Sequence, residues 1–139
     1  MSNSINIITD PEGVLWFKSY LESKHFENIH IPEDKFSPYD IEADKDGKHY
    51  IFEIKNRSCT STTWNDSIIE STKFNVLHHL KGEKYVVNLF TDCFHIHNLE
   101  SEHEEQHHMC QKTNNWNRNK VHKILISYKN TQQSKREYK

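Results

Sequence analysis

Residues 36–57, FSPYDIEADKDGKHYIFEIKNR, decide the fold, and the second half of this stretch has the pattern of a β-strand. Residues 50–56 alternate with a period of two, so the Tyr, Phe and Ile side chains share one face. Glu53 and Lys55 share the other face, where successive side chains are about 7 Å apart. A carboxylate and an ammonium group therefore project side by side from a run that is otherwise hydrophobic.

A second candidate strand lies just before it, at residues 36–43, and carries Asp40. The connecting residues, 44–48, contain Asp-Gly, which is a strong signal for a hairpin turn. A hairpin here would bring Asp40 close to Glu53. We therefore expect two carboxylates and one lysine, Lys55, to converge at one end of a sheet.

These three charged side chains suit metal-assisted phosphoryl chemistry. Two carboxylates a hairpin apart can hold a hard divalent cation through oxygen ligands, with water completing the shell. Such a cation polarises a phosphoryl oxygen and lowers the pKa of a bound water, while a neighbouring lysine can orient that water or neutralise developing charge. The residue types alone also fit a cross-strand ion pair on a charged surface, which is a common arrangement.

The order of these residues resembles the signature of the PD-(D/E)XK nuclease superfamily. Asp40 is followed by a hairpin and then by Glu-Ile-Lys at residues 53–55. A proline often stands shortly before the family's aspartate, as Pro38 does here with Tyr39 inserted. The family fold has a helix before the first strand and another after the third, and this chain offers both. Motif and element order together cover residues 12–128.

The resemblance implies a fold and an activity. The fold would be α/β, with a restriction-endonuclease-like core in which helices flank a central mixed β-sheet, in an order close to αβββαβ. The activity would be Mg²⁺- or Mn²⁺-dependent cleavage of phosphodiester bonds in DNA. Asp40 and Glu53 would bind the metal together with the backbone carbonyl of Ile54, and Lys55 would position or activate water.

Two helices supply accessory candidates. The first is predicted at residues 10–24 and carries Glu12, where related nucleases often place an extra acid; Glu12 also suits plain stabilisation of a helix N-terminus. The second is predicted at residues 64–80 and carries Lys73, three residues after Glu70. One of these two would match a polar residue that many family members point into the site, although a surface ion pair fits equally well.

The remaining chain is less distinctive. Its expected elements are a loop or short irregular strand at 25–35, strands at 84–90, 94–99 and 120–128, a solvated charged loop at 100–108, and a mobile tail at 129–139. His95 and His97 share one strand face and are interpreted as a half-exposed sheet surface. A zinc site built from His103, His107, His108 and Cys110 is the alternative to a solvated loop in this region. No Cys-x-x-Cys pair supports it.

Length and composition limit the number of domains and the classes of protein to consider. A chain of 139 residues predicts one domain, at residues 1–128, before the basic tail at 129–139. Hydrophobic residues make up 34%, so the core must be small and rich in aromatic rings. No apolar run approaches a membrane span and no signal pattern opens the chain, which makes a cytoplasmic location the default expectation. The three glycines stand apart, which argues against a phosphate-binding loop.

Charge is distributed unevenly. The net charge is −2, yet residues 112–139 carry eight Lys or Arg and one acid. A basic segment on an acidic body is the asymmetry expected of a segment that touches phosphate, although a solvated tail fits as well. The DNA-binding candidates are Arg57, Lys112, Arg118, Lys120 and Lys123.

The sequence is also compatible with two other functions. The chain could be a non-catalytic nucleic-acid-binding or protein-interaction module that retains the nuclease fold, since folds outlive functions. It could also be a zinc-stabilised binding protein. If it is a nuclease that cuts two strands symmetrically, a homodimer would be needed.

Overall fold

The computed structural model describes residues 10–34, 36–57, 60, 66–111, 120–129 and 135–137. The elements are α1 (Asp10–Ser23), β1 (Glu27–His30), β2 (Ile41–Lys45), β3 (Lys48–Asn56), β4 (Asp66–Glu70), α2 (Ser71–His78), β5 (Glu83–Leu89), β6 (Phe94–Asn98), β7 (Glu104–Gln111), β8 (Lys120–Lys129) and β9 (Lys135–Glu137).

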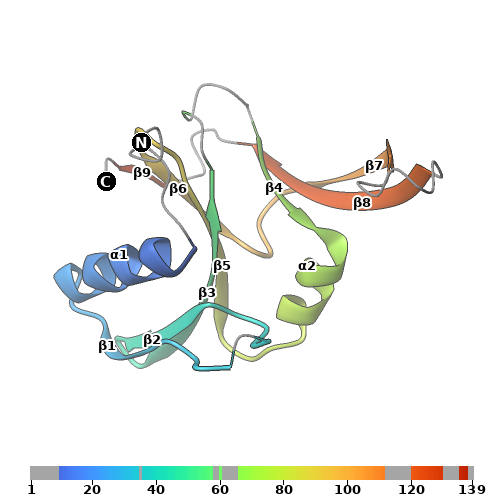
Figure 1. Ribbon diagram of the computed structural model, residues 1–139. Helices are drawn as coiled ribbons and strands as arrows, with labels where there is room; N and C mark the ends of the chain where they lie inside the picture. The colour runs from blue at the N-terminus through green and yellow to red at the C-terminus, as the bar shows by residue number, and fades with distance from the viewer. Residues whose placement is uncertain are drawn as a thin grey trace.

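The predicted central mixed sheet is confirmed. Its strand order is β1-β2-β3-β5-β6-β9, in which β3 and β5 are parallel and the other pairs antiparallel. In Figure 1, α1 lies on one side of this sheet and α2 on the other. A smaller antiparallel sheet, β4-β8-β7, lies on the α2 side.

The β2–β3 hairpin forms at the predicted Asp-Gly. Asp46 and Gly47 both have positive φ, 53° and 79°, the condition for the mirror-image turn that matches strand twist. The first strand is shorter than predicted and begins at Ile41, because the chain turns before it, where Ser37 N donates to the Asp34 carbonyl. The ladder nevertheless continues to Asp40, whose N–H donates to the Phe52 carbonyl.

Helix α1 packs on the hydrophobic face of β3, as the alternation predicts. Phe17 and Leu21 bury against Phe52. The helix begins so close to the strand that a Cβ added at Gly13 would lie 2.6 Å from Asn56 Oδ1. This contact fixes the start of α1 over the end of β3.

Helix α2 covers the opposite face of β3. Parallel strands need a crossover, and here α2 lies between β3 and β5 in sequence. Leu77 of α2 packs in a core with Ile51 of β3 and Val86 of β5. The crossover therefore carries α2 over the strand face that bears Glu53 and Lys55.

The second helix is shorter than the sequence predicts. The prediction placed one helix at residues 64–80, but Asp66–Glu70 form β4 and the helix starts at Ser71. The β-branched Ile68 and Ile69 pair with β8 instead of continuing a helix face. Val76, a large hydrophobic residue of α2, is exposed.

Two other segments also differ from prediction. The charged loop predicted at 100–108 becomes the edge strand β7, which pairs with β8 along its length through backbone hydrogen bonds that need no hydrophobic pattern. Residues 135–137 of the predicted mobile tail form β9 and pair with β6. The domain boundary at residue 128 stays a prediction. Among the described residues, no helix is long and apolar enough to span a bilayer.

Candidate metal and active site

Glu53 is a carboxylate buried in the centre of the sheet. Its side chain lies on the face of β3 that looks toward α2, and the residue is 4% exposed. Its Oε1 is buried and has no hydrogen-bond partner. Burial, and then the nearby charge of Asp40, raise the pKa of Glu53 to about 7, against the lowering effect of Lys55 and Lys73.

Asp40 approaches from the other arm of the hairpin, as predicted. Its Oδ2 accepts a hydrogen bond of 2.7 Å from the backbone N–H of Ile54. That bond fixes the Asp40 carboxylate beside the backbone of residues 53–55. Ile54, which follows Glu53 directly, is thereby bonded to the other predicted metal-binding acid. Asp40 also lines an open cavity of about 390 Å³ that Pro11, Leu15 and other residues border. Glu53, Lys55 and Lys73 do not line this cavity.

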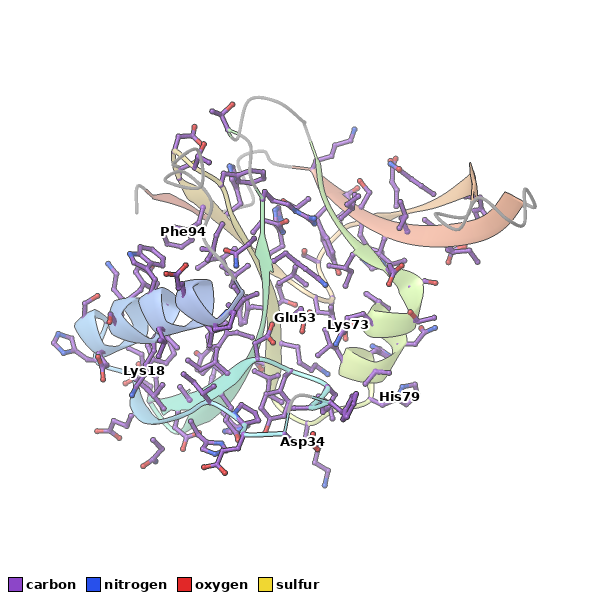
Figure 2. All side chains as sticks on the ribbon, in the orientation of Figure 1. Lys18, Asp34, Glu53, Lys73, His79 and Phe94 are labelled. Carbon is purple, nitrogen blue, oxygen red and sulfur yellow. The ribbon has the colours of Figure 1, made fainter. Side chains whose placement is uncertain are left out.

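Two lysines flank Glu53. Lys55 Nζ lies 3.3 Å from Glu53 Oε2, and Lys73 Nζ lies 3.8 Å from Oε1. Figure 2 shows Lys73 reaching from α2 toward Glu53 across the space between helix and sheet. Of the two candidates on the predicted second helix, Lys73 is the one that lies beside Glu53. Glu70 is exposed at the end of β4.

This group of residues fits a hard divalent cation. A buried carboxylate oxygen without a hydrogen bond, beside a second carboxylate, is a donor set that such an ion would complete. No group of three or more His, Cys, Asp or Glu side chains placed to hold a metal occurs in the part of the chain that the structure describes. Two acids, a backbone carbonyl and water would therefore have to form the shell.

The remaining predicted site residues lie away from Glu53 or outside the described residues. Glu12 is exposed in the first turn of α1. Arg57 is turned inward: Nε donates to Asn88 Oδ1 at 2.9 Å and a terminal nitrogen donates to the Ile68 carbonyl at 2.7 Å. The candidates Lys112 and Arg118 lie outside the described residues, as do the side chains of Lys120 and Lys123 in β8.

A buried polar row beside the site was not predicted. Register places Lys55 next to Asn88 of β5 and Asn88 next to His95 of β6. His95 and His97 are 3% and 4% exposed, so their interpretation as a half-exposed surface is wrong. Tyr128 of β8, in the smaller sheet, stacks on His97 at 5.3 Å between ring centroids, and His97 in turn stacks on His95 at 6.2 Å. The polar Asn88 inside an apolar strand was the available signal.

Comparison with known proteins gives a fold relative. No protein-family model matches the chain, and no curated protein matches it in sequence. Among solved structures, the Holliday junction resolvase Hjc of the archaeal hyperthermophile Archaeoglobus fulgidus is similar, with a TM-score of 0.54 and 13% identity. The match covers 84% of this chain and 87% of that one. The predicted restriction-endonuclease-like α/β fold is therefore confirmed at the level of architecture.

Proposed function

We propose that the protein is a metal-dependent endonuclease of the PD-(D/E)XK type that hydrolyses phosphodiester bonds in DNA. The observation that carries this proposal is the convergence of Asp40, Glu53 and Lys55 in the predicted geometry, with a buried carboxylate oxygen left for a cation. The fold shared with a resolvase supports it.

Each residue has a distinct part. Asp40 and Glu53 would hold Mg²⁺ or Mn²⁺ with the Ile54 carbonyl, and the bound ion would supply Lewis-acid polarisation of the phosphate. The Ile54 N–H holds Asp40 in one orientation. Lys55 keeps an ammonium group beside Glu53, where it orients the attacking water or neutralises negative charge.

Lys73 acts from the other side. Its ammonium group, 3.8 Å from Glu53 Oε1, adds a second positive charge to the buried carboxylate. It therefore favours the ionised form of Glu53 that metal binding needs. Glu12 is proposed only as an accessory acid at the start of α1.

DNA would meet the basic C-terminal part of the chain. The β7–β8 pair extends away from the body as a two-stranded ribbon, a shape that fits a DNA major groove. We assign Lys112, Arg118, Lys120 and Lys123 to phosphate contacts from this ribbon and the residues that join its strands. Arg57, whose donors point inward, would contribute mainly to structure.

The proposed substrate class is branched or duplex DNA. The resolvase named above acts, by its description, on Holliday junctions, and this chain has the same fold. We propose a homodimer for symmetric cutting of two strands. The alternative, a non-catalytic DNA-binding module on the same fold, would bind these substrates without cutting them.

Cleavage of labelled junction, duplex and single-stranded DNA tests the proposal, with Mg²⁺, Mn²⁺ or EDTA. We expect metal-dependent cutting that falls about 10²-fold or more in Lys55→Ala and Asp40→Ala. The matched control is Lys48→Ala, an exposed lysine at the other end of the same strand, which should cut normally. Binding without cutting in the wild type would favour the non-catalytic module.

A further inference from the structure

A second concave site lies on the face of the sheet opposite Glu53. A groove of about 450 Å³ opens between the C-terminal end of α1, the tip of the β2–β3 hairpin and strands β5 and β6. Tyr50 and Phe52 of β3 line it, and they alternate with Glu53 along the strand. The groove is therefore separated from the candidate metal site by the thickness of the sheet.

Aromatic rings form the floor of this groove. Tyr50 lies near-parallel to Phe52, with centroids 6.2 Å apart, and to Tyr85 of β5 at 5.9 Å. Phe26 stands edge-on to Tyr50 at 5.3 Å. Tyr50 and Tyr85 are only partly buried. A platform of rings that stays open to solvent is suited to a flat π-system, which would stack on it.

Two lysines stand at the rim. Lys24 Nζ lies 5.5 Å from the centroid of Tyr20, and Lys45 Nζ lies 5.1 Å from that of Phe26. Cation–π attraction holds both ammonium groups over the aromatic walls. Asp46 is the acid among the lining residues, so the rim carries a net positive charge. A ligand that complements this groove joins a flat ring to a negative group.

We propose that this groove binds the base and phosphate of an unpaired nucleotide in single-stranded DNA. The base would stack on Tyr50 and Tyr85, and its phosphate would lie between Lys24 and Lys45. The volume lies within the range of about 300–1,000 Å³ that is typical of ligand sites. The choice of DNA as the source rests on the proposed function, whereas the groove itself involves none of the metal-site residues.

The first test measures affinity for a short fluorescent oligothymidine in EDTA, by anisotropy. We expect the double variant Lys24→Glu/Lys45→Glu to bind about tenfold more weakly than wild type. The control, Lys18→Glu/Lys81→Glu, makes the same change in net charge at two lysines that do not line the groove, and it should keep most of the affinity. Equal losses in the two double variants would overturn the proposal, because the effect would then be one of overall charge.

The second test locates the base. An oligothymidine that carries 5-iodouracil should photocross-link to Tyr50 or Tyr85, and the yield should fall in Tyr85→Leu, whose folding circular dichroism checks. Cross-links confined to other segments would contradict the assignment. Competition by free thymidine monophosphate as strong as that by the oligonucleotide would also overturn it, in favour of a free-nucleotide site.

Failure of this inference is distinguishable from failure of the nuclease proposal. Lys24→Glu/Lys45→Glu should retain metal-dependent cutting of duplex DNA, because neither lysine lies near Asp40 or Glu53. Asp40→Ala should lose cutting while it still binds the oligothymidine. A wild type that binds single strands but cuts nothing would support the groove and contradict the nuclease.

Discussion

The Glu53 side chain is buried, so water solvates its ionised form poorly. Burial and the neighbouring Asp40 raise its pKa to about 7, which means that the charged form costs free energy in the metal-free protein. A displacement from 4.5 to about 7 corresponds to a cost of about 3 kcal/mol for the ionised form. A bound divalent cation would reverse this balance, because it favours the ionised carboxylate.

The first prediction concerns stability in EDTA. The folded-state pKa of Glu53 lies above its unfolded value, so the folded protein binds the extra proton between about pH 4.5 and 7 and loses stability as the pH rises through that window. Glu53→Gln removes this dependence. Thermal unfolding should show Glu53→Gln gaining about 1–3 kcal/mol relative to wild type between pH 5 and pH 8. A constant difference between the two proteins would contradict the buried ionisable role.

At the scale of elements, the β2–β3 hairpin and the neighbouring β1 carry a network of histidines and carboxylates. His49 Nδ1 lies 2.6 Å from Asp44 Oδ1, and its Nε2 lies 3.0 Å from Glu42 Oε1. His30 also contacts Glu42, at 3.0 Å. The hydrogen bond to Asp44 raises the pKa of His49, with smaller contributions from the charges of Asp44 and Glu42.

The second prediction concerns this network. Because the folded-state pKa of His49 lies above 6.5, the pairing stabilises the hairpin fully below pH 6.5 and is lost as the pH rises through the folded value. NMR titration of the His49 ring, identified by its absence in His49→Gln, should give a midpoint above 6.5. Asp44→Asn should lower that midpoint, and Asp46→Asn, a change at the adjacent turn, should leave it unchanged. A midpoint indifferent to Asp44→Asn would refute the pairing.

The third prediction concerns the contact between α1 and β3. A methyl group at Gly13 would lie 2.6 Å from Asn56 Oδ1 and 3.0 Å from Leu89 Cδ1, so either these side chains or the helix must shift. Gly13→Ala should cost about 1–3 kcal/mol despite the better helix propensity of alanine. Ser19→Ala, on the exposed side of α1, is the control and should change the free energy of unfolding little. Chemical denaturation measures both, and a stabilised Gly13→Ala would show that the start of α1 does not pack so closely.

The sequence predicted the elements whose signals are local. The hairpin followed from Asp46-Gly47, and the two faces of β3 followed from its period of two. The smaller sheet was missed because Ile68 and Ile69 fit a helix stripe as well as a strand, and their strand partner lies in β8, far along the chain. Tyr128, which covers His97, belongs to that same sheet. Lys73 could be proposed from its helix, but its distance from Glu53 depends on the crossover.

At the scale of the whole molecule, Arg57 joins the two sheets. It leaves the end of β3, and its guanidinium group donates to Asn88 of β5 and to the Ile68 carbonyl of β4. Its planar fork holds two acceptors in a fixed geometry, which the compact ammonium group of a lysine does not reproduce. The smaller sheet, and with it the basic ribbon proposed to contact DNA, is thereby fixed to the strand that carries Glu53.

The fourth prediction separates this structural role from DNA contact. Arg57→Lys keeps the charge but loses the paired hydrogen bonds, so the free energy of unfolding should fall by about 1–3 kcal/mol. Affinity for duplex DNA, measured below the unfolding transition, should change little. A stable Arg57→Lys variant with weakened DNA binding would assign the residue to the DNA surface instead.

The most direct test of the metal site is a calorimetric titration of the wild-type protein with Mn²⁺ at pH 8, compared with Asp40→Asn and Glu53→Gln. We predict binding by the wild type, loss of binding in both variants, and unchanged binding in the Lys48→Ala control. Proton release on binding should increase as the pH is lowered toward 7, because the pKa of Glu53 lies near that value. Binding that survives both carboxylate variants, or no binding at all, would contradict the claim that Asp40 and Glu53 form a metal centre.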